Sequence, residues 1–129
     1  MAATADIRRR WRSGDSYGYQ ALAGVRIFGG TMVGVTAALA AVPAAHPSAV
    51  ALIGFAEESI DNRNGATGDW TVVAKKGVTL IPLSGATPAD IGKPVYASAD
   101  DTFTLTAGAL LQAGTLHAID ADGVWLKTL

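Results

Sequence analysis

Short runs of apolar residues alternate with clusters of glycine, asparagine, aspartate and proline along most of the chain. Runs of roughly four to eight residues bounded by such turn formers predict β-strands, because an amphipathic helix needs a longer segment with apolar residues every three or four positions. The predicted strands cover residues 21–28, 31–36, 49–59, 70–76, 77–83, 94–99, 102–106, 113–120 and 124–129.

The connections between these runs carry their own signals. The paired glycines at 29–30 predict a tight hairpin between the first two strands, because glycine supplies the positive φ angles that a two-residue turn requires. Thr87 as N-cap, Pro88 at the first helical position and Gly92 as terminator predict one short helical turn. Residues 37–48 are expected to be a proline-punctuated connection without a strand.

Many short strands at close intervals predict an all-β fold, a small β-sandwich or barrel. A chain of 129 residues is the size of one domain, and without cysteine its stability must come from packing or from partners. Residues 1–19 show neither strand nor helix periodicity, so we expect an extended N-terminal arm that is ordered only where something holds it. The single β-domain is then expected to span residues 20–129.

Positive charge is concentrated in the arm. Residues 1–20 hold four arginines against two aspartates, a net charge of +2, whereas the whole chain has a net charge of −1. The charged cluster of the arm consists of Arg8, Arg9, Arg10, Trp11 and Arg12. It is consistent with a partner-binding arm, because arginine pairs with carboxylates or phosphates and tryptophan anchors by burial, and equally with a solvated tail. Four arginines make a small electrostatic footprint, so we do not expect nucleic acid as a partner.

An uncharged stretch from Ile27 to Ala56 resembles a membrane span or the apolar part of a twin-arginine signal. Eighteen residues separate Arg12 from Thr31, however, whereas in a signal peptide the apolar region directly follows the basic one. Pro43 and Pro47 would also break a spanning helix. The sequence therefore favours neither a membrane segment nor an export signal.

Residues able to do catalytic chemistry are scattered. Asp100 and Asp101 are neighbours on a predicted strand connection, where adjacent side chains point to opposite faces, so we expect a turn rather than a pair of catalytic carboxylates. His46 and His117 are the only histidines, and they lie on different predicted elements. A small hydrolase, which would have to bring one of them beside a carboxylate or serine, stays as a remote alternative. We expect no catalytic residues and no cofactor.

The loop at 61–65, with the sequence Asp-Asn-Arg-Asn-Gly, resembles a calcium-binding loop, in which alternating Asp and Asn ligands precede an obligatory glycine. With Gly65 as that glycine, the first ligand position falls on Ile60 and the glutamate position falls on Thr71. Neither residue provides a carboxylate. We therefore expect no metal site.

The order and spacing of the strands from about residue 50 onward resemble the small capsid decoration, or cement, proteins of tailed bacteriophages. Three segments carry the resemblance: ALIGFAEESIDNRNGATGDWTVVAKKGVTLIPL, ADIGKPVYASADDTFTLT and GTLHAIDADGVWLKTL. The positions that match the pattern of this group are Ile53, Gly54, Ala56, Glu57, Lys76, Gly77, Pro82, Ile91, Gly92, Lys93, Val95, Tyr96 and Gly114.

The resemblance implies a β-tulip-like scaffold and a structural protein of the virion rather than an enzyme. It implies a homotrimer on the outer surface of the capsid, at three-fold and quasi-three-fold positions, that binds the major capsid protein and stabilises the head. Some of the apolar surface in residues 31–56 is then expected to be buried between three-fold related subunits. Another virion subunit, from the tail, the neck or a receptor-binding device, is the alternative.

The arm is expected to lie against the capsid or against neighbouring decoration subunits. Its arginines would meet acidic groups and its aromatic side chains would give apolar anchorage. The residues expected to bind partners are Arg8, Arg9, Arg10, Trp11, Arg12, Tyr17 and Tyr19.

Overall fold

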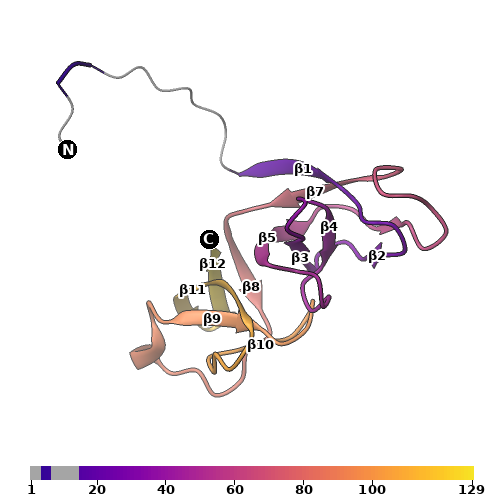
Figure 1. Cartoon of the computed structure of the whole chain (residues 1–129). Coiled ribbons are helices and arrows are strands. Elements are labelled where there is room, and N and C mark those ends of the chain that lie inside the picture. The colour runs from indigo at the N-terminus through magenta and orange to yellow at the C-terminus, as the bar shows by residue number, and fades with distance from the viewer. Residues whose placement is uncertain (1–3, 7–14) are drawn as a thin grey trace.

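The computed structural model describes residues 4–6 and 15–129. Its described part consists of twelve β-strands and one short 3₁₀ helix, so the all-β prediction is confirmed. The strands form two five-stranded sheets and one two-stranded sheet, and the two large sheets lie beside each other, joined by the passage from β7 to β8 (Figure 1).

The first large sheet has the strand order β1-β7-β5-β3-β4, and its neighbours are antiparallel. After β1 the chain returns to the opposite edge, where Ala21 bridges Ala41 and the Leu22 amide donates to the Ala41 carbonyl at 3.0 Å. The sheet is thereby curled toward a small barrel. Its strands are β1 (Ser16–Gln20), β3 (Met32–Val35), β4 (Ala41–Pro43), β5 (Ala51–Ala56) and β7 (Thr71–Lys75).

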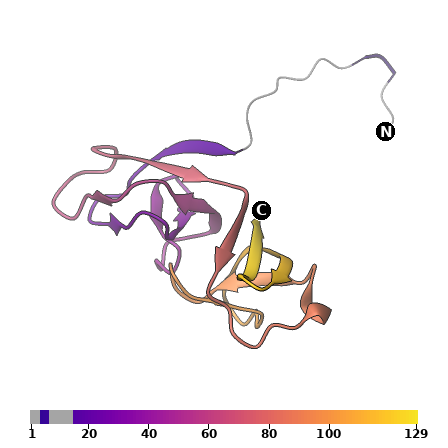
Figure 2. The ribbon, with the colours of Figure 1, turned by 180° about the vertical axis from the view of Figure 1, so that it is seen from behind.

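The second large sheet has the order β10-β9-β11-β12-β8 and is also antiparallel. It is built from consecutive segments of the C-terminal half, as Figure 2 shows from behind. Its strands are β8 (Val78–Ile81), β9 (Pro94–Ala97), β10 (Phe103–Thr104), β11 (Leu111–Asp120) and β12 (Gly123–Thr128). The predicted helical turn is confirmed as the 3₁₀ helix η1 (Pro88–Asp90), where Asp90 accepts a hydrogen bond from the Thr87 amide at 2.9 Å.

Two hydrophobic clusters form the core. The first lies between the curled sheet and the two-stranded sheet of β2 (Arg26–Ile27) and β6 (Ile60–Asp61). The second lies between the two large sheets and takes Met32 and Leu52 from the first sheet. Strands β3 and β5 are therefore buried on both faces, which explains why their sequences are continuously apolar instead of alternating.

The hairpin predicted at Gly29–Gly30 is wrong. Strand β2 pairs with β6, and β3 pairs with β4 and β5. The two glycines instead lie against the end of β5 and the segment after it, because the Gly30 amide donates to the Ala56 carbonyl at 2.8 Å and the Gly29 amide to Ser59 Oγ at 2.8 Å.

The expectation that residues 37–48 contain no strand is also wrong. Strand β4 lies inside this segment and pairs with β3 through a short turn, in which the Thr36 amide donates to the Ala40 carbonyl at 2.9 Å. Leu39 adopts a left-handed backbone conformation (φ 65°) in this turn. Pro43 is tolerated because it ends a strand at the sheet edge, where one amide needs no partner.

The expected boundary between arm and domain needs a correction. Residues 16–20 form strand β1, and β7 pairs with them from Ser16 opposite Lys75 to Gln20 opposite Thr71. The sheet therefore begins by Ser16, four residues before the boundary expected from the sequence. The absence of a periodic signal in this segment follows from its composition, since its apolar side chains are two tyrosines separated by a glycine.

Candidate interaction surfaces

The residues expected to bind partners fall into two groups. Arg8, Arg9, Arg10, Trp11 and Arg12 lie outside the described residues. Tyr17 and Tyr19 lie on β1, where both are half-buried, and the Tyr19 ring packs against the first hydrophobic cluster. The structure thus places Tyr19 in the packed fold of the chain rather than in a free arm.

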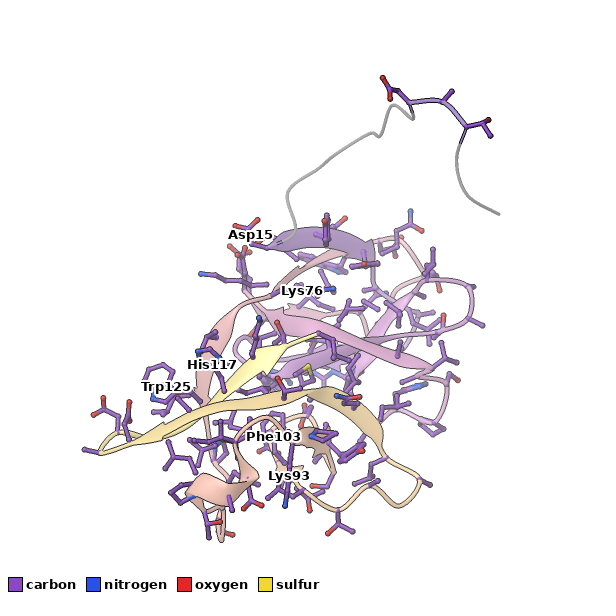
Figure 3. The ribbon with its side chains drawn as sticks, turned by 90° about the vertical axis from the view of Figure 1, so that its left-hand side faces the viewer. Asp15, Lys76, Lys93, Phe103, His117 and Trp125 are labelled. Carbon is purple, nitrogen blue, oxygen red and sulfur yellow. The ribbon has the colours of Figure 1, made fainter. Side chains whose placement is uncertain are left out.

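The outer face of the second large sheet carries apolar side chains. The register of β8 and β12 sets Leu80 opposite Trp125 and Val78 opposite Lys127, and these side chains alternate with the buried Ile81, Val124 and Leu126. Val78 and Leu80 are each 46% exposed. Figure 3 shows Trp125 and His117 toward the same end of this sheet.

Trp125 is held in position on this face. Its indole Nε1–H donates to Asp120 Oδ2 at 2.9 Å, across the turn that joins β11 to β12. This hydrogen bond lowers the pKa of Asp120 below its usual value. The indole therefore keeps a polar anchor while its apolar part stays available on the surface.

Two further exposed apolar residues lie at one end of the first sheet. Leu39, in the turn between β3 and β4, and Val50, just before β5, are both exposed. The Val50 amide donates to the Val35 carbonyl at 2.8 Å, which fixes the start of β5 beside the end of β3. Most of the larger apolar residues of 31–56 are buried or half-buried in the core, and Leu39 and Val50 are the exposed large ones of this segment.

The surface formed by the described residues includes two hollows that matter for catalytic chemistry. The larger, about 330 Å³, lies between the loop after β4 and the segments around β9 and β11, and includes His46, Ser98 and Leu110. The smaller, about 160 Å³, lies beside the start of β8 and includes Phe55, Lys75 and Thr79.

Neither hollow assembles a nucleophile with its base. In the larger one, His46 Nδ1 accepts the Ser48 amide at 3.1 Å, while Ser98 Oγ donates to the Thr102 carbonyl at 3.2 Å. No carboxylate is among the described residues that line it. His117 lies elsewhere, on β11. Asp100 and Asp101 lie in the bend between β9 and β10, as the turn prediction expected.

The loop that resembled a calcium site is organised around its own side chains. Arg63 pairs with Asp61, with Arg63 Nη2 at 2.7 Å from Asp61 Oδ2. Asn62 is buried and donates from Nδ2 to the Leu22 and Ala66 carbonyls, each at 3.0 Å. Within residues 4–6 and 15–129, no three His, Cys, Asp or Glu side chains gather in a way that could hold a metal ion.

Acid should destabilise the fold through its paired carboxylates. Hydrogen bonds from the Arg63 side chain and amide lower the pKa of Asp61 to about 2, and the Thr87 amide, with Lys93, lowers that of Asp90. A lowered folded-state pKa contributes stability that is present above the ordinary value and is lost as pH falls through the folded value. We expect the melting temperature to decline between about pH 4 and pH 2.

Thermal unfolding followed by circular dichroism from pH 7 to pH 2 measures this decline. Asp61→Asn and Arg63→Ala should both make it shallower, since each removes the pair that lowers the pKa of Asp61. Added salt should reduce the difference between these variants and the unmodified protein, because the pair is exposed. An acid profile unchanged by both substitutions would contradict the assignment.

Sequence reasoning missed two features of these surfaces. The role of Asn62 depends on carbonyls about 40 residues away along the chain, and no local pattern signals it. The exposed Val78 and Leu80 were visible as part of an apolar run, but the run does not reveal which positions face outward.

The described residues contain no helix with the length and apolar character needed to cross a membrane.

Comparison with known proteins adds no family to this description. No family model, no curated protein and no solved structure matches the chain.

Proposed function

We propose that this chain is a structural subunit of a bacteriophage head, a decoration protein that binds the outer surface of the capsid and stabilises it. The observation that carries the proposal is the set of exposed apolar side chains on a small all-β chain: Val78 and Leu80 on the second large sheet, and Leu39 and Val50 at one end of the first. Apolar patches of this kind are typical of protein contacts. The resemblance of residues 50–129 to cement proteins supports the same function.

The physical advantage of such a subunit lies in multiple weak contacts. A trimer seated on a three-fold position touches several capsid subunits at once, and each added contact becomes intramolecular once the first has formed. Individually weak patches then hold the subunit firmly against the internal pressure of packaged DNA. The partners proposed here are the major capsid protein, two further copies in a homotrimer, and neighbouring decoration subunits contacted by residues 1–14.

Heads that carry the protein should survive heating, chelator and low salt better than heads that lack it. The comparison uses particles assembled with and without the chain, with DNA release as the measurement. Equal survival, together with the protein on tails or necks, would favour the alternative of another virion subunit. Protein that is monomeric both in solution and on the particle would contradict the trimer.

The arginine cluster should act mainly on the rate of binding. Ion pairs at the edge of a protein interface speed association, and salt screens them. Replacing Arg8, Arg9, Arg10 and Arg12 by alanine should therefore slow capsid loading most at low ionic strength. Trp11→Ala should mainly speed dissociation, because a buried aromatic side chain governs residence time. Arg63→Ala is the matched control, since this arginine is paired within its own loop.

Deletion of residues 1–14 tests whether this segment contributes to binding at all. Strand β1 remains in the truncated protein, so the fold should be retained, whereas removal of residues 1–19 would also take most of an edge strand away. If the protein lacking residues 1–14 decorates heads as tightly as the intact one, the segment is a passive tail.

A further inference from the structure

Strand β8 lies at an edge of the second sheet, and half of its backbone hydrogen-bonding groups point away from the molecule. β12 pairs with it on one side, and the described residues place no strand on the other. The Thr128 amide donates to the Gly77 carbonyl at 3.0 Å. The alternation of an antiparallel ladder therefore turns the backbone groups of Thr79 toward β12 and those of Val78 and Leu80 outward.

This edge carries no charge, proline or bulge, three of the features that usually prevent strands from pairing. Natural edge strands are protected by charged side chains, proline, bulges or short length. Residues 77–81 contain no charge and no proline, and the ladder with β12 runs without a register shift. The opposite edge of the same sheet is only two residues long, Phe103–Thr104, and β4 ends at Pro43. In the described structure, β8 is the edge strand with exposed branched aliphatic side chains on its surface.

We propose that β8 pairs with β8 of a second copy of this chain, antiparallel, about a two-fold axis that passes beside Thr79. In this register Thr79 faces Thr79 of the second copy, and Val78 faces Leu80 of the second copy. The outward amides and carbonyls of Val78 and Leu80 then find partners on both chains. The second large sheet of one copy and the second large sheet of the other copy then form one continuous sheet across the axis.

The side chains of the strand favour a second copy over an unrelated partner, because they complement themselves in this register. Trp125 lies beside Leu80 on the outer face, so the pairing continues one apolar row from Trp125 through Leu80 to Val78 of the second copy. Lys76 falls opposite Pro82 of the second copy, which keeps the lysines of the two chains at opposite ends of the ladder. An uncharged strand also offers nothing that would select a charged partner.

The contact is small, so it should be weak between isolated subunits. It does not depend on the proposed function, since it requires only the purified protein. On a capsid it would link decoration subunits at adjoining three-fold positions, in addition to any contact within a trimer.

A single introduced cysteine tests the register directly, because the chain has no cysteine of its own. Directly opposed residues of a non-hydrogen-bonded pair have Cα atoms about 4.5 Å apart, within the range that a disulfide spans. Thr79→Cys should therefore convert under mild oxidation into a covalent pair of doubled mass. Val78→Cys is the matched control: diagonal positions lie about 7–8 Å apart, too far for a disulfide without backbone movement.

Most of the Thr79→Cys protein should migrate as the covalent pair on a non-reducing gel, and most of the Val78→Cys protein should not. Adding Leu80→Lys to Thr79→Cys should abolish the linkage, because a charge at an edge prevents strand pairing. Circular dichroism of each reduced variant checks the fold. If Thr79→Cys does not fold, Val78→Cys combined with Leu80→Cys should give the covalent pair instead, since these positions are opposed.

A folded Thr79→Cys protein that stays unlinked would overturn the proposal, and so would equal linkage of Thr79→Cys and Val78→Cys. Head survival in the decoration experiment is measured separately. The pairing can therefore fail while decoration holds, and decoration can fail while the pairing holds.

Discussion

Gly114→Ala is expected to lower the free energy of unfolding by about 4 kcal/mol or more, enough to unfold a protein of ordinary stability. Gly114 lies on β11, where it pairs with Thr128 of β12 and with Val95 of β9. A Cβ at this position would overlap the carbonyl oxygen of Lys127 and would lie 2.9 Å from its carbonyl carbon. These are backbone atoms, so no side-chain rotation relieves the clash.

The neighbouring strands cannot easily move apart either. β11 is the central strand of its sheet, with β9 on one side and β12 on the other, and its buried Leu116 contributes to the second hydrophobic cluster. A shift at Gly114 would therefore disturb two ladders and the core between the large sheets. Soluble expression and urea unfolding followed by circular dichroism measure the effect.

Gly108→Ala is the matched control. Gly108 has a positive φ of 50°, but nothing lies within 4 Å of where its Cβ would be. An alanine there should cost about 1 kcal/mol, the penalty of a left-handed backbone without a steric clash. Equal losses for the two substitutions would show that the close approach of β11 and β12 is not as tight as the geometry requires.

The strands predicted with success are those whose pattern is local. β7 alternates exposed and buried residues along TVVAK, and glycine, proline or aspartate lies at the ends of β8, β9 and β11. The alternation and these turn-forming residues were sufficient to predict the strands. β4 was missed because its three residues are surrounded by alanine and proline, which carry little strand signal. Its existence depends on pairing with β3, a tertiary contact.

Pairing partners were harder to predict than strands. Gly29 and Gly30 have the composition of a hairpin turn, but their amides are satisfied by Ser59 and Ala56, about 30 residues further along the chain. A local turn signal does not reveal a hydrogen-bond partner that lies far away along the chain. For the same reason the sequence showed residues 16–20 as an extended segment without revealing that β7 would hold it.

Only part of the candidate surfaces could be predicted from the sequence. The sequence located the arginine cluster, because charge is visible residue by residue. It did not locate the exposed edge at Val78 and Leu80, because exposure is decided by which neighbour the strand acquires on each side. Edge position is a property of the whole sheet, and only the topology supplies it.

Asn62→Asp is expected to destabilise the protein by about 3–5 kcal/mol at pH 7, through a charge buried without a partner. Asn62 is 1% exposed, and its Nδ2 donates to the carbonyls of Leu22 and Ala66. A carboxylate at the same place presents an oxygen to these two acceptors instead of a donor. The change is nearly isosteric, so the loss measures electrostatics rather than packing.

The destabilisation by Asn62→Asp should depend on pH with a definite sign. Burial and the facing carbonyls disfavour the ionised form, so the folded-state pKa of the new carboxyl lies above its unfolded value of about 3.9. A raised folded-state pKa means that the penalty is small below the unfolded value and grows as pH rises through the folded value. Once protonated, the carboxyl can also donate one of the lost hydrogen bonds.

The measurement is the difference in unfolding free energy between variant and unmodified protein, from urea unfolding at pH 7 and at pH 4. Taking the difference at each pH removes the acid sensitivity that both proteins share through Asp61 and Asp90. The Asn62→Asp penalty should shrink toward pH 4, whereas Asn62→Ala should lose about 1–3 kcal/mol at both values, because it leaves the carbonyls unpaired without adding a titratable group. An Asn62→Asp penalty that is absent at pH 7, or that stays constant with pH, would show that Asn62 does not hold its loop to Leu22 through these bonds.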